Sequence, residues 1–325
     1  MRLATYRTAH GDCVGVVDPH GHYVLDLAAA AEAERQDPSV YASMQALIEA
    51  GPAALDLARE LDARFNGKEH STTVAHVKLL APIPIPAQIR DFSVFPMHVK
   101  NAPRGMQRIL ARRQGDEAAA SAAQGAADVP QAYRDRPIYY ITNRFSVAGP
   151  EETVRWPRYS EVMDFELEIA AILGPCGANI SKQDARKHIF GYTIFNDFSA
   201  RDRQIDEMQG RLGPTKGKSF DLGNAMGPWI ITADEIDDPY SLAASVRVNG
   251  DVWTTTSTAD MLHSFEDMIA YVSEDETLYA GEVFGSGTMN NGCGLEIDRF
   301  LKDGDMVELE VEKIGVLRNK VVRQK

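Results

Sequence analysis

The segment 164–173 constrains the fold of this chain more than any other part of its sequence. It reads Asp-Phe-Glu-Leu-Glu-Ile-Ala-Ala-Ile-Leu. Successive side chains of a β-strand point to opposite faces, so one face would carry Phe165, Leu167 and Ile169. The other face would carry the carboxylates Asp164, Glu166 and Glu168. The rest of the segment is apolar, which predicts a strand that runs into a hydrophobic core.

Two interpretations of this acidic face remain open from the residues alone. Carboxylates that lie side by side repel one another and raise each other's pKa values, unless a cation lies between them. The alternative is a half-exposed edge strand whose acids lie in water. Taken alone, the Glu-x-Glu pattern favours the edge strand.

A second acidic element follows another apolar run, at 195–202, and reads Phe-Asn-Asp-Phe-Ser-Ala-Arg-Asp. A strand that ends in Asn196-Asp197 places polar groups at a sheet edge, where functional sites are often built. The alternative is an Asx turn with an Asp–Arg pair on the surface. A third element places Asp91 seven residues before His98, and the alternative there is a half-buried histidine with its hydrogen bonds satisfied.

The chain divides most naturally at the proline-rich run Pro-Ile-Pro-Ile-Pro at 82–86, because alternating prolines disfavour both helix and central strand. Residues 1 to about 30 predict short strands, and 40–65 predict helices broken at Gly51-Pro52. We therefore expect a small N-terminal α+β domain over 1–82 and a larger, mainly β domain over 83–325. Helices are expected at about 181–188, with Ser181 as N-cap, and at about 261–272.

Residues 114–132 form an alanine-rich stretch of low complexity inside the second domain. Both a surface insertion and a lid over a site fit this composition. The lid is our hypothesis, because the stretch lies between His98 and the acidic segment 164–173.

Composition narrows the partners of the chain. Its 325 residues include 34 Lys plus Arg and 47 Asp plus Glu, a formal charge of −13, which argues against nucleic acid and anionic membranes. The three cysteines are far apart and no apolar stretch is long enough for a transmembrane helix, so we expect a reducing, cytoplasmic location and no membrane contact.

Taken in order, these elements resemble the fumarylacetoacetate hydrolase family. The matching motifs are Asp-x6-His at 91–98, Asp-Phe-Glu-Leu-Glu at 164–168, Asn-Asp-Phe-Ser-Ala-Arg-Asp at 196–202, Gly-Lys-Ser-Phe at 217–220 with Gly-Pro-Trp at 227–229, and Gly-Ser-Gly-Thr at 285–288. The resemblance covers about residues 80–310. It implies a mixed β-sandwich or β-roll for the C-terminal domain and a homodimer.

The resemblance also implies a metal site. Four carboxylates hold a hard divalent cation in this family, and the matching positions are Asp91, Glu166, Glu168 and Asp197. Oxygen ligands suit Mg²⁺, Mn²⁺ or Ca²⁺ better than Zn²⁺. The sequence does not choose among the three ions.

Further site residues follow from the same resemblance. His98 matches the family's general base and Glu296 matches the acid that orients it. Arg201, Gln204 and Lys218 match residues around the metal and the leaving carbanion. The substrate-binding positions are Ser93, Arg104 and Thr288.

Part of the substrate-binding region departs from the pattern of true fumarylacetoacetate hydrolases. Ser93 and Met208 stand where substrate-contacting tyrosines are expected, and both Arg104 and Arg108 are candidates for a substrate arginine. Fumarylacetoacetate itself is therefore not the expected substrate.

The implied activity is hydrolysis of a C–C bond in a 1,3-diketone or diketo acid by a water that His98 activates. The alternatives on the same scaffold are a 2-oxo acid decarboxylase and an isomerase or tautomerase of oxo-dienoates. A non-catalytic protein that the metal stabilises is a third class. The expected partner in every enzymatic case is a small oxo acid or diketone.

Overall fold

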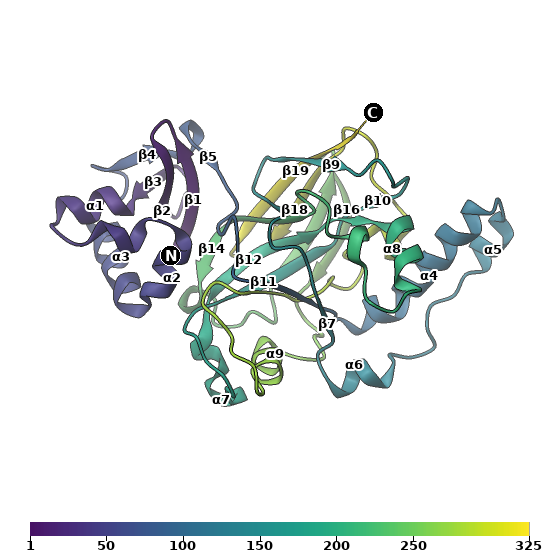
Figure 1. Ribbon diagram of the computed structural model, residues 1–325. Coiled ribbons are helices and arrows are strands. Elements are labelled where there is room, and N and C mark those ends of the chain that lie inside the picture. The colour runs from purple at the N-terminus through teal and green to yellow at the C-terminus, as the bar shows by residue number, and fades with distance from the viewer. Residues whose placement is uncertain (325) are drawn as a thin grey trace.

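The computed structural model describes residues 1–324 (Figure 1). The N-terminal unit is a small sheet covered by helices on one face. Its strands are β1 (Arg2–Thr8), β2 (Gly11–Val17), β3 (Tyr23–Asp26), β4 (Ser71–Thr73) and β5 (Lys78–Leu79). Its helices are α1 (Leu27–Ala33), α2 (Met44–Ala50) and α3 (Pro52–Phe65), with short 3-10 turns at Pro38–Tyr41 and Val74–His76. The predicted strands, and the helix break at Gly51-Pro52, are confirmed.

The C-terminal part contains two packed sheets, which confirms the expected mainly β architecture. The strands that it adds to the larger sheet are β6 (Ile89–Phe92), β7 (Tyr139–Ile141), β8 (Val147–Ala148), β11 (Leu167–Leu173), β12 (Ile189–Asp197), β14 (Asn224–Thr232) and β17 (Val283–Gly285). The second sheet has the order β16-β15-β18-β19-β9, from Asp251–Ser257, Ala243–Val248, Met306–Val311, Gly315–Arg323 and Thr153–Trp156. A separate pair joins β10 (Met163–Asp164) to β13 (Ser199–Ala200).

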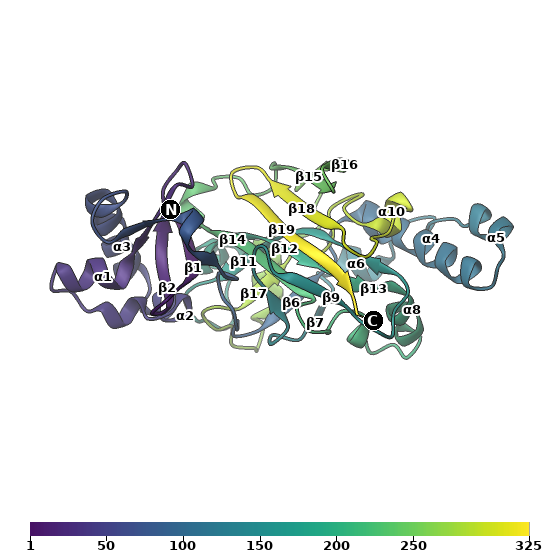
Figure 2. The ribbon, with the colours of Figure 1, turned by 90° about the horizontal axis from the view of Figure 1, so that it is seen from above.

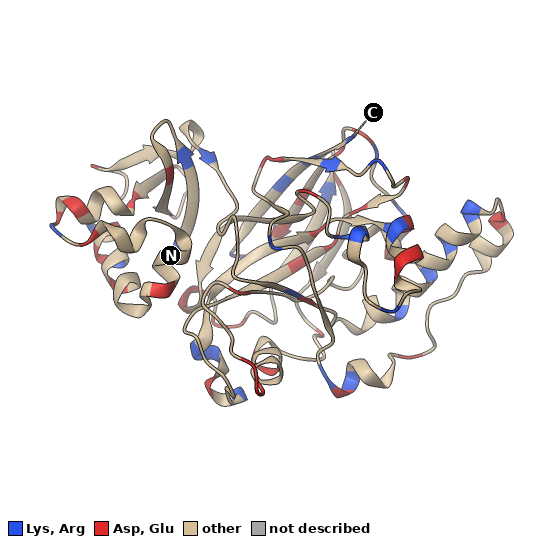
Figure 3. Cartoon of the chain, in the orientation of Figure 1, with Lys and Arg blue, Asp and Glu red and all other residues tan. Residues whose placement is uncertain are grey.

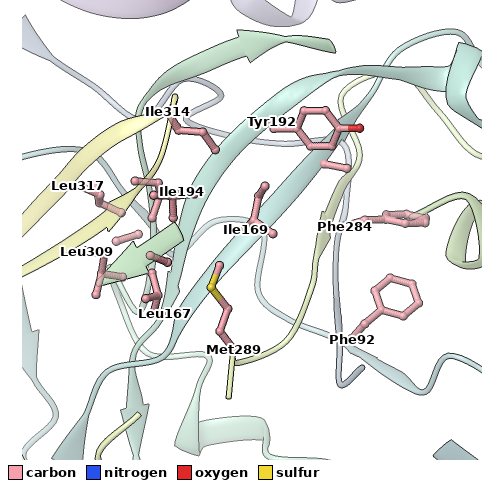
Figure 4. Packing of buried hydrophobic residues seen from close by; sticks show 14 of the residues in the cluster. Phe92, Leu167, Ile169, Tyr192, Ile194, Phe284, Met289, Leu309, Ile314 and Leu317 are labelled. Carbon is pink, nitrogen blue, oxygen red and sulfur yellow. The ribbon is translucent and has the colours of Figure 1, made fainter. Parts of the chain in front are cut away.

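The main hydrophobic core lies between the two sheets (Figure 4). Leu167 and Ile169 of β11 and Ile194 of β12 pack with Leu309 and Leu317 of the second sheet. Every residue of β11 is buried, because the opposite face of this strand packs under the N-terminal unit. The apolar tail of the segment 164–173 therefore lies in a core, as predicted.

The two units share one sheet (Figure 2). Strand β1 pairs antiparallel with β14, so the order runs β4-β3-β2-β1-β14-β12-β11-β17-β6-β7 through a sheet of 12 strands. Residues 82–86, the proline run, form neither helix nor strand. The division at 82/83 stays a prediction, since backbone hydrogen bonds cross between the two units.

Helices cluster at the end of the molecule opposite the N-terminal unit (Figures 1 and 2). They are α4 (Pro96–Arg113), α5 (Glu117–Ala122), α6 (Gln131–Asp135), α8 (Arg201–Met208) and α10 (Gly294–Ile297). Two other helices lie outside this cluster, α7 (Lys182–Ala185) and α9 (Phe265–Val272). Ser181 caps α7 as expected. Helix α9 begins later than the predicted 261, because Ser264 and Asp267 form a capping box that fixes its start. Further 3-10 turns lie at Arg186–His188, Thr215–Gly217 and Ala233–Glu235.

Charged residues are distributed over both units, with Lys and Arg interspersed among Asp and Glu (Figure 3). Within residues 1–324, no helix is both long and apolar enough to cross a membrane.

Candidate active site

Four carboxylates meet where neighbouring strands of the large sheet end. Asp91 comes from β6, Glu168 from β11, Asp197 from the end of β12, and Glu166 from just before β11. One oxygen of each lies within 4.8 Å of one from every other, and all four residues are buried. The edge-strand interpretation is therefore wrong, because β11 lies between β12 and β17 and the acids of this segment are buried.

The donor set fits a divalent cation. Oδ1 of Asp91, Oε1 of Glu168 and Oδ1 of Asp197 are buried without a hydrogen-bond partner. Burial raises the pKa of all three carboxyl groups, and at Glu168 the neighbouring negative charges raise it further. A Cβ atom on Gly285 would lie 2.7 Å from Asp91 Oδ1, so glycine keeps the space beside the carboxylates open. Oxygen-only ligands of this kind suit Mg²⁺, Mn²⁺ or Ca²⁺.

Two buried cations hold the fourth carboxylate in its charged form. Lys218 Nζ donates to Glu166 Oε2 at 2.5 Å and also bonds Asp197. Arg201 Nη2 lies 2.7 Å from Glu166 Oε1. Burial alone would raise the pKa of Glu166, but Arg201 and Lys218 outweigh burial and lower it. Gln204, one turn along α8, accepts from Arg201 Nη1 at 2.9 Å, so these three predicted residues form one group.

Asp164 does not join the carboxylate cluster, although the strand pattern placed it on the same face. The expected continuous strand is interrupted between β10 and β11, which turns Asp164 away. Its Oδ2 accepts from Arg201 Nε at 2.7 Å, and its Oδ1 accepts from the backbone N–H of Gly294 at 2.7 Å. The sequence motifs did not predict that Asp164 would bind Arg201 and Gly294. The only indication that Asp164 belongs to the site was its position two residues before Glu166.

His98 and Glu296 form a pair beside the cluster. His98 lies on the first turn of α4, and Glu296 lies on α10 after a chain separation of 198 residues. Nδ1 of His98 lies 3.0 Å from Oε2 of Glu296, and the other oxygen accepts from the backbone N–H of Asn291 at 3.0 Å. Burial alone would lower the pKa of His98, whereas the Glu296 carboxylate raises it, and the net shift is upward.

Cys293 completes the surroundings of this pair and was not predicted. Its Sγ donates to Glu296 Oε2 at 3.4 Å and lies 3.8 Å from His98 Nδ1. Burial raises the pKa of this thiol well above its usual value, so the neutral thiol faces Glu296.

A cavity of about 360 Å³ is lined by His98 and by three of the four carboxylates, Asp91, Glu166 and Glu168. The predicted residues Ser93, Gln204, Lys218 and Thr288 line it, and Thr288 Oγ1 is buried without a partner. Arg104 lies outside the lining, with its Nη2 3.4 Å from the carbonyl oxygen of Glu296.

Tyr140 also lines this cavity, although the sequence motifs did not predict it. Its hydroxyl donates to Asp197 Oδ2 at 2.5 Å, and burial raises its pKa well above the usual value. Tyr140 lies after the alanine-rich insertion, and none of the sequence motifs includes it. Within the insertion, none of the residues 114–132 lines the cavity, so the lid stays a hypothesis.

Comparisons with known proteins identify the family of this chain. The family described as "Fumarylacetoacetate (FAA) hydrolase C-terminal" matches residues 108–322, a match that begins after Asp91 and His98. A mitochondrial oxaloacetate tautomerase of Xenopus laevis is 31% identical over 99% of this chain and 90% of its own length.

Solved structures show the same fold. The structure of a probable 2-hydroxyhepta-2,4-diene-1,7-dioate isomerase from Mycobacterium abscessus matches with a TM-score of 0.73 at 26% identity, covering 100% of both chains. A maleylpyruvate hydrolase from Sphingobium sp. SYK-6, in complex with manganese(II) and pyruvate, matches with a TM-score of 0.70 at 23% identity, again over 100% of both chains. With the family match covering most of the sequence, the chain belongs to the fumarylacetoacetate hydrolase family.

Proposed function

We propose that this protein is a divalent-metal-dependent enzyme that moves a proton at the carbon next to the carbonyl group of a 2-oxo acid, interconverting keto and enol forms. The observation that carries the proposal is that His98, whose Nδ1 lies 3.0 Å from Glu296 Oε2, lines the same cavity as the buried carboxylates Asp91, Glu166 and Glu168. The name of the Xenopus laevis relative, an oxaloacetate tautomerase, supports the same reaction type.

Asp91, Glu166, Glu168 and Asp197 would hold the cation. The bound cation would polarise the 2-oxo group and stabilise negative charge that develops on its oxygen. The three carboxylate oxygens without partners supply the negative charge that such an ion needs.

His98 transfers the proton in this proposal. Because Nδ1 faces Glu296, the Nε2 atom is the one available to the substrate. The raised pKa of His98 makes the imidazole a stronger base, and Glu296 stabilises the imidazolium that forms. Thr288 Oγ1 and the Gln204 side chain line the same cavity and would fix the orientation of the oxo acid.

Hydrolysis of a C–C bond in a diketo acid is the second candidate. The grouping of Arg201, Gln204 and Lys218 favours it, because fixed donors beside the cavity can stabilise a departing enolate. In that reaction His98 would activate a water molecule instead of taking a proton from carbon. A decarboxylase would use the same residues and release CO₂.

A panel of oxaloacetate, acylpyruvates and 2,4-diketo acids tests these reactions, each with Mg²⁺ or Mn²⁺. Ultraviolet absorbance follows the enol, and mass spectrometry identifies products. We expect faster keto–enol exchange at unchanged mass, lost in His98→Ala and retained in His76→Ala, a control at an exposed histidine. Two fragments would instead establish hydrolysis, and CO₂ would establish decarboxylation. Metal-dependent stability without any consumption of these compounds would point to a non-catalytic binding protein.

The cytoplasmic location and the homodimer stay predictions. The Xenopus laevis relative is named as mitochondrial, which gives an alternative to the cytoplasm.

A further inference from the structure

The cavity changes character along its length. At its inner end it is lined by the carboxylates, Lys218, Gln204 and Thr288. Farther out, the lining is mainly apolar and includes Val99, Ala102, Met106, Tyr133, Ile138 and Met208, of which only Tyr133 carries a polar group in its side chain.

Two helices produce this gradient. On α4, His98 is followed by Val99, Ala102 and Met106, whose spacing of three and four residues keeps them on one face. At 1.5 Å per residue, this face extends about 12 Å from His98 to Met106. On α8, Gln204 lies near Arg201 and Met208 lies one turn farther along. Each helix therefore presents a polar residue near the carboxylates and an apolar residue farther out.

The third wall comes from the segment that follows the insertion. Tyr133 lies on α6, and its carbonyl oxygen accepts from His263 Nε2 at 2.8 Å, which ties α6 to the body of the protein. Ile138 lies immediately before β7. Both side chains line the cavity, so the apolar section is closed on this side as well.

The apolar section offers no cation to a second acid group. Of the residues among 1–324 that line the cavity, Lys218 is the only lysine or arginine, and it is engaged by Glu166 and Asp197.

Nearby arginines lie outside the cavity lining. Arg104 Nη2 lies 3.4 Å from the Glu296 carbonyl oxygen while its Nε is buried without a partner, Arg108 lies 3.9 Å from Asp298, and Arg203 stacks over Tyr159. A carboxylate placed in the apolar section would find no lysine or arginine in that part of the described lining to pair with, whereas an apolar substituent would gain contacts there.

We infer that the substrate is a 2-oxo acid with a single carboxylate and an apolar alkyl or aryl substituent, which occupies the section between α4, α6 and α8. This inference rests on the proposed function, because the metal end must hold the oxo acid group. It goes beyond that function because it specifies the chemistry of the substrate at the end farthest from the metal. A dicarboxylate such as oxaloacetate is then a poor ligand for this chain.

Equilibrium binding tests the inference without requiring turnover. Isothermal titration calorimetry on the Mn²⁺-loaded protein would give Kd for pyruvate, 2-oxobutyrate, 2-oxopentanoate and 2-oxohexanoate. We expect Kd to fall about fourfold for each added methylene. A matched pair isolates the charge, since 5-methyl-2-oxohexanoate replaces the second carboxylate of 2-oxoglutarate with an isopropyl group of similar shape. We expect 2-oxoglutarate to bind at least about tenfold more weakly.

A charge-introducing variant checks the location. Met208 is 43% exposed, so Met208→Arg can be accommodated, and we expect it to tighten 2-oxoglutarate binding several-fold. Val252→Arg adds the same charge at a 54% exposed site on β16 and should leave 2-oxoglutarate binding unchanged.

The outcomes separate the two proposals. If pyruvate binds but Kd does not fall with chain length, or if 2-oxoglutarate matches its isopropyl analogue, the substrate class is wrong and the proposed function stands. If no 2-oxo acid binds the Mn²⁺-loaded protein, the proposed function fails and the substrate class fails with it.

Discussion

Arg201 donates from Nε to Oδ2 of Asp164 across 2.7 Å, and both side chains are buried. The same Asp164 oxygen accepts from the backbone N–H of Leu295 at 3.1 Å, at the start of the helix that carries Glu296. Asp164 thus links the arginine beside the carboxylate cluster to the segment that orients His98. This contact joins the two halves of the proposed active site.

The first prediction concerns Asp164→Asn. Removing its charge leaves Arg201 buried with only part of its compensation, and we expect the free energy of unfolding to fall by about 3–5 kcal/mol. Urea unfolding followed by circular dichroism measures this change. Asp206→Asn is the matched control, since Asp206 pairs with Arg113 at the surface and should cost about 0–1 kcal/mol. Equal losses for the two variants would contradict a linking role for Asp164.

The second prediction concerns Glu296→Gln. We expect kcat to fall about 10²–10⁴-fold, because His98 loses the anion that stabilises its protonated form. Glu296 raises the pKa of His98 and burial lowers it, so the neutral amide leaves burial dominant. The limb of the pH–rate profile that reports His98 should therefore move to lower pH. A limb that stays in place would show that another group titrates, and Glu161→Gln, at an exposed acid paired with Arg323, provides the control.

The third prediction concerns metal removal. The pKa values of Asp91, Glu168 and Asp197 are raised in the folded protein without a cation. A carboxyl group whose pKa is raised in the folded protein stabilises the fold at pH values below its unfolded pKa, which is about 4. This stabilisation is lost as the pH rises through the pKa of the folded protein.

The metal-free protein should therefore lose stability as pH rises from about 4, and saturating Mn²⁺ at 100 times its Kd should restore about 2.7 kcal/mol. Thermal unfolding with and without EDTA at pH 5 and pH 8 measures the difference, which we expect to be larger at pH 8. An EDTA effect that is the same at both values would argue against these carboxylates as the ligands.

The fourth prediction concerns Asp91→Asn. Loss of one charge from the cluster should weaken Mn²⁺ binding at least tenfold, yet raise the melting temperature of the metal-free protein, because repulsion among the buried carboxylates falls. Calorimetric Mn²⁺ titration and differential scanning fluorimetry provide the two readings. Glu310→Gln, on the far sheet, should change neither. A lower melting temperature for metal-free Asp91→Asn would mean that the carboxyl group serves the fold and not a cation.

The fifth prediction concerns thiol reactivity. Cys293 is buried and its raised pKa keeps it as an unreactive thiol, whereas Cys176 is exposed. Brief treatment with iodoacetamide should therefore alkylate Cys176 and leave both Cys293 and turnover unchanged, as peptide mass spectrometry can show. Rapid labelling of Cys293 in the folded protein would show that the pocket around Glu296 opens.

The residues predicted to act together lie far apart in the sequence, and the motifs identified most of them. The order of the motifs carried the family resemblance, and that resemblance grouped Asp91, Glu166, Glu168 and Asp197, which the structure brings within 4.8 Å of one another. Alternation also predicted correctly that Leu167 and Ile169 face the core. Local capping chemistry likewise identified Ser181 at the start of α7.

What the sequence determined by itself was the burial of the apolar residues of the segment 164–173 and the motifs that carry the family resemblance, which in turn implied the acidic donor set, because these depend on residue type and short spacing. Only the tertiary structure decided that β11 is central rather than an edge strand, since strand order depends on pairing between distant segments. It also turned Asp164 toward Arg201, brought Cys293 to His98, and placed apolar faces of α4 and α8 on one cavity. Those contacts arise from packing across the chain, which no local pattern encodes.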